Sequence, residues 1–205
     1  MSGKPYHVGH DAMVRQASKQ CDRVLLFVST SDRARPGETP ILGKDMEQIW
    51  KQFIQPTLPR NVEVAYGGSP VGHVWKALGK ANEDGSEDTY VIFADAADLA
   101  QNFTENLLKK YCGNLFDAGQ VKLEATERAF SGTQMRAYLS SGDKESFIKH
   151  LPSQVDGEAV WNVLYATAKN PPKVKTTAGP TRKPAAKKGP VEGLLRRYVR
   201  LLLDG

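Results

Sequence analysis

Apolar and polar positions follow two periods along the first 168 residues. The runs at 24–28 and 90–94 are continuous, apolar and rich in β-branched or aromatic residues, which is typical of strands buried on both faces. Residues 121–125 alternate between apolar and polar, as in a strand with one half-polar face, and 62–66 read as a further strand. The pattern therefore predicts four strands.

Between these strands, apolar residues recur at helical spacing. Ser69 is expected to cap a helix that has Pro70 at its first position, and Gly113 is expected to end another. The predicted helices cover 11–20, 44–54, 70–82, 104–111, 131–142, 143–150 and 157–168. This alternation predicts an α/β domain over residues 1–168, with a parallel sheet, right-handed crossovers and a ligand site at the carboxyl ends of the strands.

The C-terminal part has a different composition. Residues 169–190 are rich in Pro, Lys, Thr and Ala and contain no acidic residue, which predicts a basic, disordered linker. Residues 191–205 place apolar side chains at i, i+3 and i+4, which predicts an amphipathic helix. Such a helix needs a partner: the chain's own body, a second subunit of a homo-oligomer, another protein or a membrane surface. The linker could also contact nucleic acid nonspecifically.

Composition bounds the class of protein. A chain of 205 residues with 40% hydrophobic content fits one domain and an appendage. Its apolar runs are far shorter than the roughly 20 residues of a membrane helix, and residues 1–4 lack the apolar region of a signal peptide. We therefore expect a soluble cytoplasmic protein with no membrane span. Cys21 and Cys112 lack metal-like spacing and are expected to be reduced structural thiols.

The net charge of +5 is unevenly distributed. From Lys169 onward there are ten basic residues and two acidic ones, which leaves 18 basic and 21 acidic residues before it. The main domain is therefore mildly acidic. That balance argues against a nucleic-acid-binding surface on the domain, although an isolated basic pocket remains compatible with it.

One short stretch, Pro5 to His10, concentrates candidate chemistry. Its sequence Pro-Tyr-His-Val-Gly-His places two imidazoles and a glycine just before a predicted helix. Helix N-termini attract anions through their free N–H groups and their dipole, and Gly9 lets a polyanion approach the backbone closely. The stretch therefore predicts a phosphate-binding site.

Two motifs carry a resemblance to a known family. Residues 5–10 resemble the P-x-H-x-G-H signature of the nucleotidylyltransferase superfamily, and residues 130–136 (Phe-Ser-Gly-Thr-Gln-Met-Arg) are similar to its I-S-x-T-x-x-R motif. The motifs lie more than a hundred residues apart and in the family's order. The chain also resembles uncharacterised nucleotidyltransferase-like proteins of bacteriophages, which would place it in the host cytoplasm.

This resemblance implies a Rossmann-like fold and an activity. The enzyme would transfer a nucleoside monophosphate from ATP or CTP to a small acceptor, phosphorylated or similar, and release pyrophosphate. Such transfer depends mainly on positioning and on neutralising phosphate charge. Mg²⁺ would accompany the triphosphate, bound mainly by phosphate oxygens and water.

The resemblance also implies roles for individual residues. His7 and His10 would contact the phosphates, with His10 nearest the α-phosphate in the transition state. Ser131 and Thr133, at the start of a helix, would contact the triphosphate, although hydroxyls at that position also cap helices that bind nothing. Arg136 would reach the β- or γ-phosphate, since a guanidinium matches phosphate oxygens with a fixed set of donors; a surface salt bridge is its alternative role.

Four further candidates rest on weaker signals. Lys44 follows the first strand, in a segment where the family often places a basic phosphate contact, and a solvated lysine fits equally well. Asp95 and Asp98 follow the strand at 90–94, where relatives contact nucleotide or acceptor groups; ordinary loop acids are the alternative. His73 repeats part of the first motif but falls inside a predicted helix, which favours a structural role.

The resemblance leaves one element unaccounted for. In the family, a strand in the middle of the sheet ends immediately before the histidine signature. Here six residues precede His7, and residues 1–4 cannot supply a strand of five or six residues. Either the native protein begins further upstream, or this variant lacks the central strand and leaves backbone groups unpaired on both neighbours.

A function of a different class stays open. The chain could be a noncatalytic nucleotidyltransferase-like scaffold, or a phage interaction protein, that binds its partner through the basic linker and the C-terminal helix. In that case the histidines would be dispensable and the tail essential.

Overall fold

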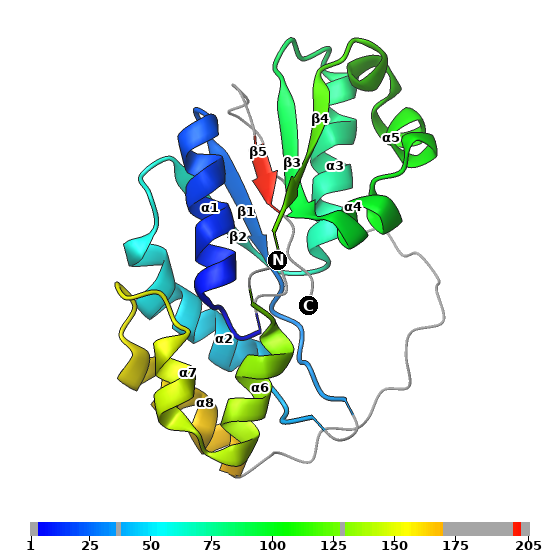
Figure 1. Cartoon of the computed structure of the whole chain (residues 1–205). Helices are drawn as coiled ribbons and strands as arrows, with labels where there is room; N and C mark the ends of the chain where they lie inside the picture. The colour runs from blue at the N-terminus through cyan, green and yellow to red at the C-terminus, as the bar shows by residue number, and fades with distance from the viewer. Residues whose placement is uncertain (1–3, 36–37, 128–129, 170–198, 202–205) are drawn as a thin grey trace.

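The chain folds into parallel strands covered by helices on both faces (Figure 1). The structure is a computed structural model, and it describes residues 4–35, 38–127, 130–169 and 199–201. The predicted mixed α/β architecture, with parallel strands and flanking helices, is confirmed.

The four predicted strands form two parallel pairs. β1 (Val24–Val28) pairs with β2 (Val62–Tyr66), and β3 (Tyr90–Asp95) pairs with β4 (Val121–Thr126). Their β-rich runs produce these strands as expected, and β3 and β4 each extend one residue beyond the prediction. Asp95 is therefore the last residue of a strand, whereas the sequence placed it in a loop.

A fifth strand, β5 (Val199–Leu201), lies between the two pairs (Figure 1). It runs parallel to both neighbours, so the strand order is β2-β1-β5-β3-β4. The backbone of Arg200 lies opposite Leu25 of β1 and Ile92 of β3. The prediction of an amphipathic helix over 191–205 is therefore wrong at 199–201. This segment pairs with backbone groups of β1 and β3 that would otherwise lack hydrogen-bond partners. The rest of 191–205, and 170–190 of the predicted linker, lie outside the described residues.

Helices from both ends of the described domain cover one face of the sheet. The apolar core there contains alternate residues of β1 (Val24, Leu26 and Val28) together with Phe93 of β3. Against them pack α1 (Val8–Gln20), α2 (Gly43–Ile49), a π-helical turn (Trp50–Ile54), α6 (Gly132–Ser141), α7 (Lys144–Lys149) and α8 (Gly157–Lys169). A short 3-10 turn (Gln55–Thr57) then leads toward β2.

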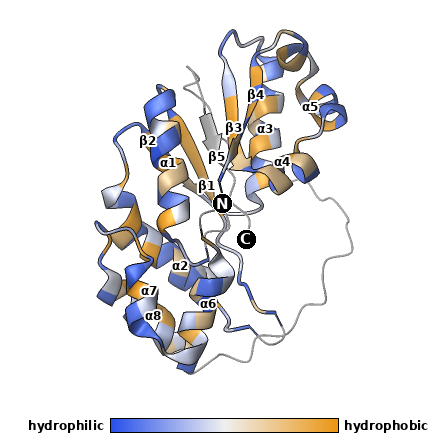
Figure 2. Ribbon diagram, in the orientation of Figure 1, coloured by the Kyte–Doolittle hydropathy of each residue, from blue (hydrophilic) through white to orange (hydrophobic). Residues whose placement is uncertain are grey.

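The opposite face is covered by the helices that flank β3 in the chain. Phe27 of β1 and Tyr90, Ile92 and Ala94 of β3 belong to this second core. The helices are α3 (Pro70–Glu83), α4 (Ala96–Asn102) and α5 (Glu105–Asp117). Figure 2 shows the hydrophobic colour concentrated on the strands and on the inner sides of the helices, as buried strands between two layers require.

Several helix boundaries differ from the sequence prediction. α1 begins at Val8, three residues earlier than expected, because the His7 side chain caps it. The helix predicted over 44–54 changes to a π-helical turn at Trp50. α4 was not predicted, and α5 continues past Gly113 to Asp117, with non-helical backbone angles at Cys112 in place of the expected end. Ser69, Ser131 and Gly142 cap helices as expected.

Gly43 holds the start of α2 against the loop that follows β1. Its N–H donates a hydrogen bond to Asp32 Oδ1 at 2.7 Å, and a Cβ added to it would lie 1.7 Å from the carbonyl oxygen of Thr30. Gly43→Ala is therefore expected to lower the free energy of unfolding by about 1–3 kcal/mol, measured by chemical denaturation.

Gly79→Ala is the matched control for this substitution. Gly79 lies in α3, where an added Cβ would meet Tyr111 O at an ordinary 3.5 Å. A helical Gly→Ala change without a clash is expected to stabilise by up to about 1 kcal/mol. Equal effects of the two substitutions would contradict the close approach at Gly43.

Two expectations from composition can be compared with the structure. No helix in the described part of the chain is long and apolar enough to cross a membrane. Cys21 and Cys112 are free thiols, Cys112 is buried, and burial raises the pKa of both to about 11. Both are therefore protonated and weakly nucleophilic at neutral pH.

Candidate functional site

The first motif forms the N-terminus of α1. The ring of His7 accepts a hydrogen bond at Nδ1 from the N–H of Gly9, at 3.2 Å, so in the neutral ring the proton resides on Nε2. His10 lies in the first turn and stacks on His7, with ring centroids 3.7 Å apart. Both side chains are buried, with 3% and 7% of their surfaces exposed. The two imidazoles therefore form one stacked pair at a helix N-terminus.

The second motif forms the N-terminus of α6. Ser131 Oγ accepts from the Gln134 N–H and the Gln134 side chain accepts from the Ser131 N–H, both at 3.3 Å, which makes a capping box. The Arg136 guanidinium donates through Nη2 to Thr133 Oγ1 at 2.9 Å. Ser131 therefore acts as a helix cap in this structure, and Thr133 orients the arginine.

The two motifs meet in space although they lie far apart in the chain. Arg136 Nη1 donates to the carbonyl oxygen of Lys4, just before the first motif, at 2.9 Å. Phe130, just before the second motif, places its ring edge-on to His7, with centroids 5.4 Å apart. A Cβ added to Gly9 would lie 3.6 Å from the Phe130 N. The N-termini of α1 and α6 therefore border one site.

Lys4 adds a buried cation to this site. Only 5% of its surface is exposed, and its Nζ contacts Ser29 Oγ at 3.5 Å and the carbonyl oxygen of Ser31. Burial lowers the pKa of Lys4 to about 8; Asp32 opposes this shift and Arg33 adds to it. The carboxyl end of β1 therefore faces an ammonium group that changes charge close to physiological pH.

A buried network braces α1 behind the histidines. Tyr6 OH donates to Asp11 Oδ1 at 3.1 Å, and Arg15 Nε and the Gln154 amide also donate to the Asp11 carboxylate. The pKa of Tyr6 is raised well above its ordinary value, mainly by burial and further by Asp11. The Tyr6 ring stacks on His10 with centroids 5.7 Å apart. These contacts fix the orientation of the imidazole pair.

The loop after β1 carries charges into the same region. Arg33 forms an isolated antiparallel bridge with Ile41, which draws the two ends of this loop together. Between them, Glu38 Oε2 lies 3.1 Å from Arg33 Nε and 3.1 Å from Arg136 Nε. The site therefore combines the basic side chains of Lys4, Arg33 and Arg136 with the Glu38 carboxylate, and the charges of Asp32 and Arg35 also act on it.

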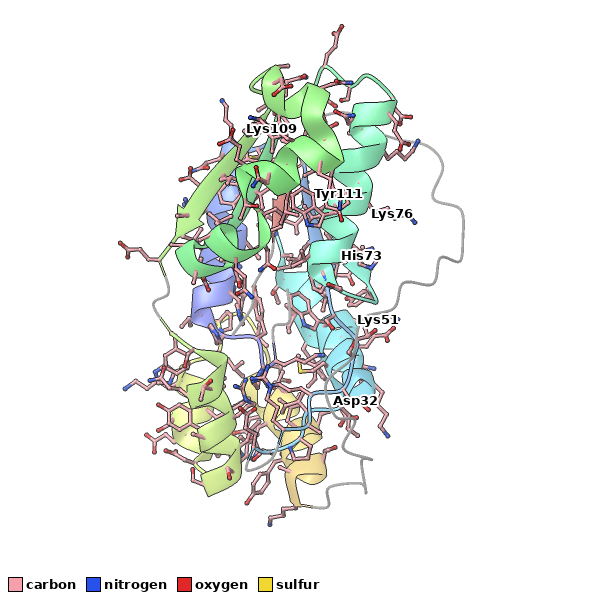
Figure 3. All side chains as sticks on the ribbon, turned by 90° about the vertical axis from the view of Figure 1, so that its right-hand side faces the viewer. Asp32, Lys51, His73, Lys76, Lys109 and Tyr111 are labelled. Atoms are coloured by element: carbon pink, nitrogen blue, oxygen red, sulfur yellow. The ribbon has the colours of Figure 1, made fainter. Side chains whose placement is uncertain are left out.

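The structure places the four weaker candidates in α2, α3 and α4 and at the end of β3. Lys44 is exposed in the first turn of α2. Asp95 caps α4, accepting from the N–H of Asp98 at 2.9 Å, and Asp98 lies within that helix rather than in a loop. His73 stacks on Phe27, with ring centroids 5.2 Å apart, as part of the second layer. Figure 3 shows His73 on α3, on the same side of the molecule as Lys76 and Lys51.

Several residues of the site were not recognised in the sequence. Lys4, Arg33 and Glu38 were not among the predicted site residues. In the sequence, these residues are marked only by their positions: Arg33 and Glu38 follow a predicted strand, and Lys4 immediately precedes the first motif. Lys4 and Glu38 become site residues through contacts with Arg136, which lies 132 and 98 residues further along the chain, and Arg33 becomes one through its ion pair with Glu38.

The described residues offer few protein ligands to a magnesium ion. The described residues contain no group of three His, Cys, Asp or Glu side chains that could hold a metal ion. The Glu38 carboxylate lies between two guanidinium groups, those of Arg33 and Arg136. The two guanidinium groups suit phosphate oxygens. A Mg²⁺ ion that accompanied a triphosphate would therefore be coordinated by phosphate and water, and would supply charge neutralisation there.

Comparison of the chain with protein-family models and with curated protein sequences finds no match.

Proposed function

We propose that the protein is a nucleotidylyltransferase with a Rossmann-like fold, which transfers a nucleoside monophosphate from a nucleoside triphosphate to a small acceptor and releases pyrophosphate. The observation that carries this proposal is the convergence of two helix N-termini, a stacked histidine pair and buried Arg136 at one site. Helix N-termini and guanidinium groups are what a triphosphate requires.

Each group has a role in this reaction. The His7 and His10 imidazoles donate to phosphate oxygens, with His10 at the α-phosphate as charge builds up there. Arg136 and Lys4 bind the β- and γ-phosphates, and the buried surroundings strengthen each of these contacts. Protein groups thus position the triphosphate and neutralise it, while the acceptor oxygen attacks in line.

The sheet topology also supports the proposal. The superfamily has a central strand just before its histidine motif, and here β5 occupies the central position from the C-terminal end of the chain. A superfamily architecture whose central strand has moved in sequence would account for this strand order. The strand that the resemblance requires therefore has a counterpart.

The test is a measurement on the wild-type chain. Binding of each nucleoside triphosphate is measured by calorimetry with Mg²⁺, and pyrophosphate release is followed with a panel of phosphorylated acceptors. We expect binding of one nucleotide and acceptor-dependent release. Absence of both binding and release for all nucleotides would overturn the proposal.

The noncatalytic scaffold needs a different test from removal of the tail. Because β5 belongs to the central sheet, deleting residues 169–205 is expected to damage the fold whether or not the protein is an enzyme. Loss of function after that deletion therefore cannot favour the scaffold. Substitution of His10 separates the two functions.

The pKa of Lys4 gives a pH dependence. Its ammonium is charged below about pH 8 and loses its proton above it, so the affinity for ATP is expected to fall by roughly tenfold or more between pH 7.5 and 9.5. Calorimetric titrations across this range measure the effect. Lys4→Met should bind ATP more weakly at pH 7.5 and lack this dependence; a flat profile for the wild type would contradict the role of Lys4.

A further inference from the structure

Each nitrogen of the Arg136 guanidinium has an oxygen neighbour within the protein: Nη1 and Nη2 donate hydrogen bonds, and Nε forms an ion pair without hydrogen-bond geometry. Arg136 is 4% exposed, and its three nitrogens contact the Lys4 carbonyl, the Thr133 hydroxyl and the Glu38 carboxylate. The first two contacts come from neutral oxygens that hold the group in place. The third is an anion, at the position where Arg136 would otherwise meet a negatively charged ligand.

Glu38 is shared between two arginines. Its Oε2 lies 3.1 Å from the Nε of both Arg33 and Arg136, and its Oε1 accepts from Arg33 Nη2 at 3.5 Å. Burial alone would raise the pKa of Glu38, but the Arg33 hydrogen bond and the charges of Arg136 and Arg35 lower it overall. The carboxylate therefore remains ionised at neutral pH and neutralises part of the basic site.

Exposure distinguishes the carboxylate from its partners. The side chain of Glu38 is 28% exposed, against 11% for Arg33 and 4% for Arg136. A hollow of about 370 Å³ opens beside it, lined by Glu38, Thr39 and Arg136 and by the hydroxyl-bearing Thr133, Ser140 and Ser141. The anion is therefore the accessible member of the cluster, next to open space.

We propose that Glu38 occupies, in the free protein, the place of a phosphate group between Arg33 and Arg136, and that a bound polyphosphate displaces it. Arg33 is then a second arginine for the phosphates of the nucleotide. A carboxylate and a phosphate present similar oxygens to a guanidinium, so one replaces the other without rearrangement of the arginines. This inference rests on the proposed function, because it assigns the phosphate of the nucleotide to this site.

Glu38→Gln tests the displacement, because it keeps the shape of the side chain and removes the competing charge. Kd values for inorganic pyrophosphate, tripolyphosphate and Mg²⁺-ATP are measured by calorimetry on the full chain. Glu38→Gln is expected to bind all three about tenfold more tightly than the wild type, which corresponds to the loss of one competing ionic contact. Adding Arg33→Gln to this variant should reverse the gain.

Glu63→Gln is the matched control. Glu63 lies on β2, away from the site, and also pairs with an arginine, Arg23, at the surface. Its substitution should leave all three Kd values unchanged. Unchanged or weaker binding by folded Glu38→Gln would overturn the proposal.

A purely structural role of Glu38 is distinguished by whether variants at this position fold. Glu38→Asp keeps the charge but shortens the side chain, so it should fold and bind pyrophosphate more tightly than the wild type. If neither Glu38→Gln nor Glu38→Asp folds, the carboxylate is a structural contact and the proposal is overturned.

Comparison of nucleotide with nucleotide-free polyphosphates distinguishes failure of this proposal from failure of the proposed function. Tighter binding of pyrophosphate and tripolyphosphate by Glu38→Gln, with no nucleotide bound by any form, would support the anion site and overturn nucleotidyl transfer. ATP binding and pyrophosphate release by the wild type, with no gain in Glu38→Gln, would support the function and overturn the role of Glu38.

Discussion

Arg200→Pro is expected to lower the free energy of unfolding by about 3 kcal/mol or more, because proline removes a backbone N–H from the middle of the sheet. Arg200 lies opposite residues of both β1 and β3, so a proline disturbs a strand that is paired on both sides. In a domain of this size the loss corresponds to a fall in Tm of about 6–12 °C. Thermal unfolding followed by circular dichroism measures it.

Arg200→Val is the control for this prediction. Valine keeps the backbone N–H and favours the extended conformation, so the variant should retain most of the stability of the wild type. If Arg200→Pro unfolds at the same temperature as Arg200→Val, residues 199–201 do not form the central strand. In that case the two strand pairs would require another connection.

His10→Ala is expected to reduce pyrophosphate release by about 10²–10³-fold, because a donor to the charge that develops on the α-phosphate is lost. The affinity for the nucleotide should fall much less, since Arg136, Lys4 and the helix N-termini still bind the phosphates. Steady-state kinetics and calorimetry on the same preparation separate these two effects. An unchanged unfolding temperature shows that the fold is intact.

His73→Ala is the matched control for the histidine. His73 also lies near the start of a helix, but it stacks on Phe27 in the other layer. Its substitution should leave pyrophosphate release within about twofold, since it contributes no donor to the phosphates. Full turnover by folded His10→Ala would favour the noncatalytic scaffold over the enzyme.

Local signals in the sequence were sufficient for most elements. The apolar run at 24–28 became β1 with the same bounds, and Ser69 with Pro70 marked the start of α3 correctly. The Ser131 cap was also recognised. In these segments the residues that decide the conformation are neighbours in the chain, because caps act within one turn and buried strands need continuous apolar side chains.

The sequence also determined which residues form the core of the candidate site. His7, His10 and Arg136 were selected from two short motifs, and the structure brings them to one place. Lys44, Asp95 and Asp98 were selected because they follow strands, in segments where the family that the chain resembles has phosphate, nucleotide or acceptor contacts. The structure places Lys44 in α2, Asp95 at the end of β3 and Asp98 in α4, since the end of a strand fixes an edge of the sheet and not a particular pocket.

Tertiary structure alone decided the remaining features. The spacing of apolar residues at 191–205 fits a helix, but 199–201 form a strand because β1 and β3 offer unpaired backbone groups on both sides, and hydrogen bonding with both outweighs local preference. Lys4 and Glu38 likewise become part of the candidate site through contacts with Arg136, which is distant in the chain, and Arg33 joins them through Glu38. Local sequence thus determined the elements and the two motifs, while contacts between distant segments decided the central strand and the charges around the candidate site.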